Sequence, residues 1–399
     1  YLLIDFSYPR PGTLECFKED CYDLDLFFAK LSAIYGVQLF PRKSVIIFDE
    51  VQLFPFARQL IKQLVKDGRF DYIETGSLIS LHKNVKDILI PSEEEHLEMF
   101  PMDFEEFLWA LGDNATVPFL KNCFEKRIPL GQALHRKTLN EFRKYMLVGG
   151  MPQAVEAFCN SGDFAKADTI KKQILSLYLA DIGKYAGKDE LKVYSLLGDI
   201  PGQLSKKEKK FKLADIDQNA RMRTYEDAFV WLDKSMIINR CVNATDPNIG
   251  LSMSRDNTTQ KCYMGDTGLL VTQTFRDNEY TDNLLYKSVL LDKLNVNEGM
   301  LMENIVAQML RCNGHHLFFY SRIDSANRSN NMEIDFLISD NKKISPVEVK
   351  SSAYRKHSSL DKFYSRFKNK LGERYVLYPK DVMIKDGVVH LPLYMAMFL

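Results

Sequence analysis

The sequence predicts a multidomain protein of the α/β class, and three observations lead to that prediction. The chain has 399 residues, of which 46% are hydrophobic and 27% charged, which is ordinary for globular proteins and sufficient for two to four domains. The apolar run 45–48 is typical of a buried strand in a parallel sheet, and helical patterns flank it. Two further strands are predicted near the C-terminus, at 333–338 and 346–350.

Composition excludes some classes of protein. Acidic and basic residues balance at 53 each, so any surface that binds nucleic acid must be local. Seven cysteines without a paired C-x-x-C motif favour reduced thiols and a cytoplasmic location. No signal peptide and no apolar run of about eighteen residues is present, so we expect no membrane span.

Two acids follow the predicted strand 45–48. The carboxyl edge of a parallel sheet is where α/β folds bind ligands, so Asp49 and Glu50 suit a site for Mg²⁺ and a nucleotide. Asp49 would hold the metal through its water shell, and Glu50 would orient or deprotonate the attacking water. The alternative is a buried strand that ends in two solvated acids.

The next predicted strand supports the nucleotide site. After a helix predicted at 55–67, the segment 70–77 predicts a strand that breaks at Thr75-Gly76-Ser77. Hydroxyl groups beside the acidic pair are placed to sense a γ-phosphate. The arrangement resembles the Walker B and sensor strands of the AAA superfamily. It resembles most closely a prokaryotic, archaeal-ATPase-like group that carries a C-terminal domain of unknown function.

The resemblance implies a P-loop NTPase-type parallel sheet that binds ATP and Mg²⁺. It places Asp49, Thr75 and Ser77 at the cofactor and makes Glu50 catalytic. The segment 99–111, with the string Phe-Pro-Met-Asp-Phe-Glu-Glu-Phe-Leu, resembles the "PLSFxEFL" signature of the same group. Where many relatives have a Gly-Arg pair before it, this chain has Ser92-Glu-Glu-Glu95, so we assign no arginine finger.

A phosphate-binding loop is absent from these residues. No G-x-x-x-x-G-K-[ST] string occurs, and the segment 183–189 has the wrong spacing. The chain opens on a strand pattern at 1–5 and does not begin with Met. We therefore expect the first strand and the phosphate loop to precede Tyr1, and expect the chain without them to bind nucleotide weakly.

Four regions are predicted along the chain: an ATPase core incomplete at its N-terminus at 1–112, a helical domain at 113–200, a winged-helix-like domain at 201–279 and a C-terminal domain at 280–399. Winged helices commonly bind DNA, and a basic stretch lies at 206–223. A solvated charged face is the interpretation of this stretch that we favour.

The C-terminal domain carries a second group of candidate residues. Glu303 lies on a predicted helix, Asp335 on the strand 333–338, and Glu348 and Lys350 on one face of the strand 346–350. This order resembles the PD-(D/E)XK nuclease fold. The resemblance implies that the three acids hold Mg²⁺ or Mn²⁺ and that Lys350 positions water or stabilises charge at the phosphate. The alternative is a hairpin with a solvent-facing Glu–Lys pair.

Two functions from different classes follow. The first is an AAA-type ATPase coupled to a nuclease-like C-terminal domain that acts on nucleic acid. The second is a nucleotide-regulated interaction protein in which an inactive nuclease fold is a docking surface. The intact Asp49–Glu50 pair favours the first. The missing arginine favours the second, or a homo-oligomer that supplies an arginine from elsewhere.

Overall fold

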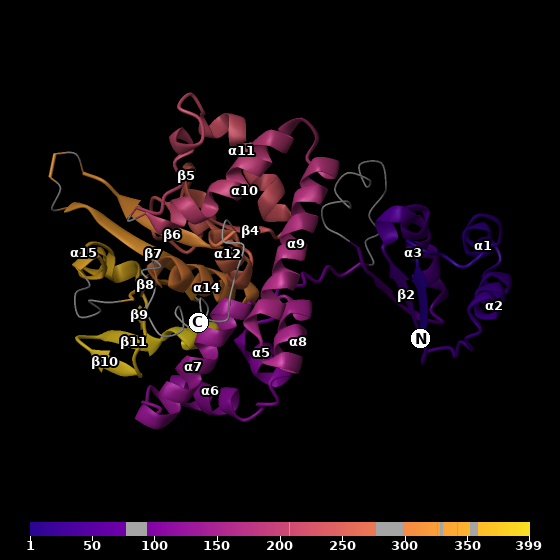
Figure 1. Cartoon of the computed structure of the whole chain (residues 1–399), viewed down its shortest axis with the longest axis horizontal. Coiled ribbons are helices and arrows are strands. Elements are labelled where there is room, and N and C mark those ends of the chain that lie inside the picture. The colour runs from indigo at the N-terminus through magenta and orange to yellow at the C-terminus, as the bar shows by residue number, and fades with distance from the viewer. Residues whose placement is uncertain are drawn as a thin grey trace. The chain divides into compact units, whose positions relative to one another are not determined.

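The computed structural model of the chain describes residues 1–76, 94–206, 208–276, 298–324, 326–327, 330–340, 342–351 and 358–399 (Figure 1). These residues form two compact units, 1–99 and 100–399, and each is described by itself. Of the residues singled out from the sequence, Ser77, Ser92, Glu93 and Lys207 lie outside the described residues.

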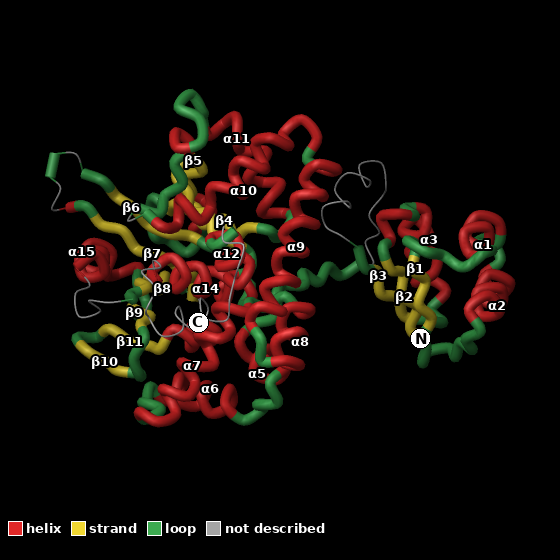
Figure 2. The backbone as a smooth tube through the Cα atoms, in the orientation of Figure 1, coloured by secondary structure: helices red, strands yellow, loops and turns green. Residues whose placement is uncertain are grey.

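The unit 1–99 is built on a parallel sheet with three described strands in the order β1-β2-β3 (Figure 2). The strands are β1 Leu2–Asp5, β2 Val45–Asp49 and β3 Asp71–Glu74. The α-helices are α1 Thr13–Glu19, α2 Leu24–Tyr35 and α3 Phe56–Asp67. The predicted parallel sheet and the helix predicted at 55–67 are confirmed.

Aromatic rings fill the core of this unit. Phe17 packs edge-on against Phe27 and Phe48, with ring centroids 5.1 and 5.5 Å apart. The run 45–48 is not buried evenly, because Ile46 and Phe48 are fully buried whereas Val45 and Ile47 are half-buried. Burying apolar side chains of this size stabilises by about 1.5–3 kcal/mol each.

In the unit 100–399, helices surround one large sheet. Its described α-helices are α5 Phe104–Ala110, α6 Thr116–Lys126, α7 Gln132–Val148, α8 Pro152–Ser161, α9 Phe164–Tyr185, α10 Glu190–Ser205, α11 Met222–Lys234, α12 Thr267–Thr274, α14 Glu298–Cys312 and α15 Ser358–Phe367. Helix α14 packs on strands β4, β5 and β8, and α15 packs on β7.

The sheet of this unit has eight described strands in the order β10-β11-β9-β8-β7-β6-β4-β5. Its members are β4 Ile238–Ala244, β5 Arg255–Met264, β6 Phe318–Arg322, β7 Met332–Asp340, β8 Lys343–Val349, β9 Arg374–Tyr378, β10 Met383–Lys385 and β11 Val388–Pro392. The sheet is mixed, because β4–β6, β8–β9 and β9–β11 pair in parallel and the other neighbours are antiparallel.

The sheet corrects the winged-helix expectation for 201–279. Strands β4 and β5, which would have formed the wing, belong to the eight-stranded sheet, and β4 pairs in parallel with β6. The sheet thus crosses the boundary expected between residues 279 and 280. A parallel pair between segments more than seventy residues apart leaves no local sequence pattern, so the hydrophobic period predicts the strands but not their neighbours.

The boundary expected at 112 also differs from the compact units, which divide at residue 99. Helix α5 begins with a capping box in which Asp103 and Glu106 satisfy each other's backbone N–H groups. Its Phe104 packs on Phe142 of α7, and the Tyr145 hydroxyl donates to the Met102 carbonyl over 2.8 Å. The signature helix therefore belongs to the second unit.

A close backbone contact positions α12 beside the end of α7. The Asp266 carboxylate accepts from the Gly150 N–H at 2.6 Å and caps α12 through the Leu269 N–H at 2.8 Å. A Cβ atom on Gly268 would lie 2.4 Å from the Val148 carbonyl oxygen. These glycines therefore allow close packing of the backbone.

Helix α14 is fixed to the same region by buried amides. Asn304 accepts from the Met264 N–H at 2.8 Å, and Gln308 accepts from the Thr267 N–H at 2.8 Å. Both amide side chains are almost fully buried. Because a buried backbone N–H without a partner is costly, these bonds set the position and rotation of the helix that carries Glu303.

Candidate functional site

The residues predicted to bind nucleotide lie at the carboxyl edge of the first sheet. Strands β2 and β3 pair in parallel, with Phe48 beside Glu74, so both deliver their next residue to the same edge. The Thr75 N–H donates to the Phe48 carbonyl at 2.9 Å, and the Thr75 hydroxyl donates to Asp49 Oδ1. The structure therefore brings Asp49 and Thr75 together.

Glu50 turns sharply away from the strand. Its φ of 54° lies in the left-handed region, which is uncommon for a residue with a Cβ atom. The Val51 N–H donates to the Thr75 carbonyl at 3.0 Å, which ties the turn to the end of β3. The buried Gln52 amide donates to Glu50 Oε2 at 2.6 Å, so the carboxylate is held in one orientation.

Gly76 makes room for this arrangement. A Cβ atom on Gly76 would lie 2.4 Å from Gln52 Oε1, closer than any side chain could be placed without movement. Gln52 was not among the predicted site residues, because a glutamine two residues after an acidic pair has no distinctive spacing.

A third carboxylate lies at the same edge and was not predicted. Asp5 ends β1 and is in register with Asp49 on β2. Hydrogen bonds from the hydroxyl and the backbone N–H of Ser7 lower the pKa of the Asp5 carboxyl group. The edge thus carries ionised oxygen donors on two neighbouring strands.

The segment where no arginine finger was assigned contains a buried ion pair instead. Arg58 of α3 donates to Glu94 at 2.6 Å and to Glu74 at 3.3 Å, and its side chain is 7% exposed. Burial raises the pKa of Glu74 to about 7, although Arg58 opposes the shift. Glu94 therefore has a structural partner within its own unit.

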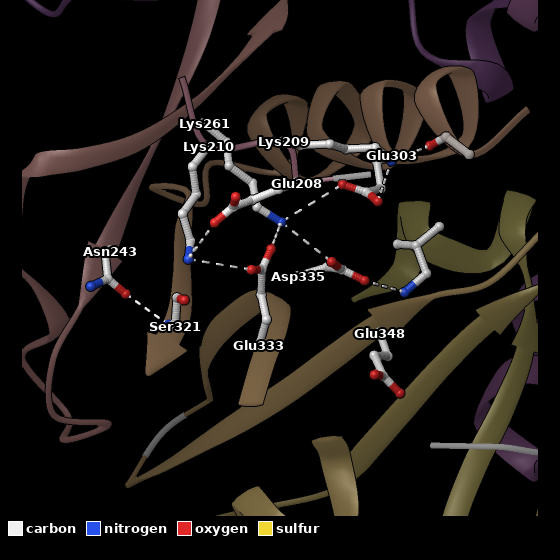
Figure 3. Close-up of polar contacts among 12 residues, drawn as sticks. Glu208, Lys209, Lys210, Asn243, Lys261, Glu303, Ser321, Glu333, Asp335 and Glu348 are labelled. Atoms are coloured by element: carbon white, nitrogen blue, oxygen red, sulfur yellow. Dashed lines mark hydrogen bonds and ion pairs between the residues drawn. The ribbon is translucent and has the colours of Figure 1, made fainter. Parts of the chain in front are cut away.

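The second candidate site lies where α14 meets the eight-stranded sheet (Figure 3). The register that pairs Phe336 with Val347 places Asp335 next to Glu348 on the neighbouring strand. Asp335 Oδ2 accepts from the Val349 N–H at 2.9 Å. Of the four predicted residues, Glu303 and Asp335 lie around the same ammonium group, and this group was not predicted.

That ammonium group belongs to Lys261 of β5. Its Nζ lies 2.8 Å from Glu333, 3.3 Å from Asp335 and 3.8 Å from Glu303, and the side chain is 1% exposed (Figure 3). Burial alone would lower the pKa of Lys261, but the three carboxylates outweigh it and the pKa is raised. Lys261 is therefore charged at neutral pH.

Glu303 has further donors. Lys209 forms an ion pair with Oε1, and the Tyr263 hydroxyl donates to Oε2 at 3.1 Å. Burial raises the pKa of the Glu303 carboxyl group, and neighbouring Asp335 adds to the shift, while the two lysines oppose it. Lys209, Lys261 and Tyr263 were missed because their partners lie 40 or more residues away in sequence.

Glu348 forms a separate pair with Lys350, 3.2 Å away, so these two side chains do share a face of β8. The Glu348 carboxyl group points away from Lys261 in Figure 3, and its buried Oε2 atom has no hydrogen-bond partner. Burial raises the pKa of Glu348 to about 7, although Lys350 opposes the shift.

The lysine stretch considered as a possible DNA-binding surface is largely paired within the unit. Lys206 lies 2.6 Å from Asp215, Lys212 lies 3.0 Å from Glu208, and Lys210 lies between Glu208 and Glu333. A lysine that is already paired with a carboxylate attracts phosphates less strongly. This finding agrees with the solvated charged face that we favoured.

The described parts of the chain lack two features, a cluster of metal-binding side chains and a helix that could cross a membrane. Among these residues, no group of three or more His, Cys, Asp or Glu side chains is arranged to hold a metal ion. Within the same ranges, no helix combines the length and the apolar character that a membrane crossing needs.

Three regions of the chain match known protein families. Residues 2–108 match a family described as an AAA domain. Residues 139–280 and 298–395 match two domains of unknown function, DUF8612 and DUF4143. No curated protein matches the chain.

Two solved structures are similar. A Walker-type ATPase of Pyrococcus abyssi is 16% identical, with 68% of this chain and 83% of that chain covered and a TM-score of 0.39. A protein from Vibrio cholerae is 10% identical, with 90% of each chain covered and a TM-score of 0.19. The region that matches the AAA-domain family is the one that holds the parallel sheet and its acidic edge.

Proposed function

We propose that the protein hydrolyses ATP at the carboxyl edge of the β1-β2-β3 sheet. The observation that carries the proposal is the meeting of Asp49, Glu50 and Thr75 at this edge, where α/β folds bind ligands. Asp49 and Thr75 would contact the metal and the phosphates of the nucleotide. We propose Ser77 as the second hydroxyl group at this cofactor site. Glu50, oriented by Gln52, would align the attacking water or accept its proton.

The donor atoms at this edge fit Mg²⁺. Carboxylate and hydroxyl oxygens are the hard donors that Mg²⁺ prefers, and Asp5 adds an ionised carboxylate in register with Asp49. The metal would neutralise charge on the phosphates. Asp49 would hold it, and Thr75 would keep the Asp49 carboxylate in place through their hydrogen bond.

Substitution of Glu50 tests this proposal. We expect Glu50→Gln to lower the rate of ATP hydrolysis by roughly 10²–10⁴-fold, because the amide cannot accept a proton, while Mg·ATP binding changes little. Phosphate release and calorimetric ATP binding are measured on the unsubstituted protein and on each variant. The exposed Glu15→Gln is the matched control. Undiminished hydrolysis by Glu50→Gln would remove Glu50 from the mechanism.

For the unit 100–399 we propose a docking role that nucleotide regulates, in place of nuclease activity. The observation that favours it is the Lys261 ammonium group among Glu303, Glu333 and Asp335, where the nuclease interpretation expects a metal. The predicted metal ligands Glu303, Asp335 and Glu348 and the predicted catalytic Lys350 thus have internal partners.

A cleavage assay separates these functions. The protein is incubated with single-stranded DNA, double-stranded DNA or RNA and with Mg²⁺ or Mn²⁺. We expect no cleavage beyond that of Asp335→Asn or Lys350→Ala, because Glu303 and Asp335 already pair with lysines and Lys350 pairs with Glu348. Cleavage that Asp335→Asn abolishes would return the unit to the nuclease class.

A further inference from the structure

We infer that Lys261 supplies the cation of the acidic centre formed by Glu303, Glu333 and Asp335, and that this centre accepts a divalent metal ion only when Lys261 is removed. The inference deepens the proposed docking role, because it explains how a nuclease-like group of acids is held without a metal. It concerns metal binding, and it can therefore fail independently of any assay of cleavage.

Distances distinguish an ammonium group from a metal in this centre. The nearest oxygens of Glu333, Asp335 and Glu303 lie 2.8, 3.3 and 3.8 Å from Lys261 Nζ. Charge-assisted hydrogen bonds to nitrogen are about 2.7–2.9 Å long, whereas Mg²⁺ needs about 2.0–2.1 Å and Ca²⁺ about 2.3–2.6 Å. Glu333 lies at the hydrogen-bond distance of an ammonium group, and Asp335 and Glu303 lie within ion-pair distance of it.

The remaining oxygens are also engaged. Glu303 Oε1 pairs with Lys209, and its Oε2 accepts from Tyr263. Asp335 Oδ2 accepts from the Val349 N–H at 2.9 Å. Each oxygen of Glu303 and Asp335 thus has a donor from the protein, so a metal would have to displace existing bonds.

Lysines also surround the carboxylates of the centre. Lys261 and Lys209 pair with them directly, and Lys210, which Glu208 shares at 3.4 Å, lies 3.7 Å from Glu333. Crowded carboxylates without cations repel one another, and this repulsion is what a nuclease relieves with metal ions. Here the lysines relieve it.

Lys261 is held in place by its strand. It lies on β5 opposite Cys241 of β4, and only 1% of its side chain is exposed. The Lys261 side chain cannot turn into solvent to leave room for a metal, because it is buried and its strand β5 is held by pairing with β4. The ammonium group is therefore a permanent part of the centre.

Removal of the ammonium group should open the site. In Lys261→Met the side chain keeps its approximate length and loses its charge, which leaves Glu333 and Asp335 without their cation. We expect this variant to gain one Mn²⁺ site by calorimetry with MnCl₂ and no nucleotide, and to be stabilised by Mn²⁺. All proteins carry Asp49→Asn, which removes Mn²⁺ binding at the proposed nucleotide site.

Two comparisons complete the titration. Addition of Asp335→Asn to Lys261→Met should abolish the gained site, and Asp335→Asn alone should leave Mn²⁺ binding as it is with Lys261 present. A folded Lys261→Met protein, judged by circular dichroism, that gains no Mn²⁺ site would overturn the inference. So would Mn²⁺ binding in the presence of Lys261 that Asp335→Asn abolishes.

A measurement on the unmodified protein covers the case in which Lys261→Met does not fold. Fe²⁺ bound in place of Mg²⁺ reduces added hydrogen peroxide to hydroxide and a hydroxyl radical, and the radical cuts the backbone near the metal. We expect no Fe²⁺-dependent cuts near Glu303 or Asp335, because the lysine excludes the ion. Cuts at these positions would show that a divalent cation enters the centre and would overturn the inference.

Discussion

The buried carboxyl group of Glu348 makes the stability of its unit depend on pH. Burial raises its pKa from 4.5 to about 7. Between these values the folded protein binds more protons than the unfolded chain, so stability is highest below about pH 4.5 and falls as pH rises to about 7. At about 1.4 kcal/mol per pKa unit, the loss is up to roughly 3 kcal/mol.

We expect Glu348→Gln to remove this loss. The variant should be more stable than the original protein at about pH 8 and equal to it at about pH 4, because an amide does not ionise. Both tryptophans, Trp109 and Trp231, lie in the unit 100–399, so the urea midpoint from tryptophan fluorescence reports this unit. The exposed Glu156→Gln is the control. Equal midpoints at about pH 8 would contradict the prediction.

The predictability of individual residues depended on how local their partners are. Asp49 and Thr75 could be placed together from sequence, because parallel strands end at one edge of a sheet. Lys261 could not, because its carboxylate partners lie 42, 72 and 74 residues further along the chain. A lysine before a Gly-Asp-Thr-Gly string carries no signal of the acids that will surround it.

At the scale of elements, local periodicity was sufficient for most helices. The pattern predicted at 55–67 agrees with α3 Phe56–Asp67 to within one residue. The positions of strands within the large sheet were not predictable. Strand β4 pairs with the next strand, β5, on one side but with the distant β6 on the other, and alternation of apolar residues does not specify which strands pair.

The contact between α7 and α12 should be intolerant of side chains. We expect Gly268→Ala to destabilise the unit by roughly 1–3 kcal/mol, because its Cβ would lie 2.4 Å from the Val148 carbonyl oxygen and 2.6 Å from Gly149. Gly198→Ala on α10 is a matched control, since its Cβ meets no atom within 4 Å. That control should gain about 0.4–1 kcal/mol.

Thermal unfolding followed by tryptophan fluorescence distinguishes these two glycine variants. A lower midpoint for Gly268→Ala and a slightly higher one for Gly198→Ala would agree with the close backbone packing. Equal midpoints for the two variants would mean that the α7–α12 contact relaxes easily and does not fix the position of α12.

At the scale of the whole molecule, the two regions of unknown function form one folded structure. The match at 139–280 supplies β4, β5 and the lysines of the acidic centre, and the match at 298–395 supplies β6 to β11 and the acids. Sequence patterns indicated separate domains because each region has its own helices and strands. The shared sheet and the ion pairs between them arise only in the folded chain.

We therefore expect residues 298–399 not to fold alone. Without the preceding region, β6 loses its β4 partner, Glu303 loses Lys209 and Lys261, and the buried Asn304 and Gln308 lose their backbone partners. Exposed strand edges and unpaired buried polar groups then oppose folding. Residues 100–399, which retain all of these partners, should unfold in one cooperative transition.

Circular dichroism and urea unfolding of the two fragments test this expectation. The 100–399 fragment should keep the near-ultraviolet spectrum that the intact protein shows from its two tryptophans, which both lie in this range. The 298–399 fragment should lack a sigmoidal transition. A cooperative transition for 298–399 would show that the sheet tolerates an unpaired β6 edge and that Glu303 does not depend on the lysines across the boundary.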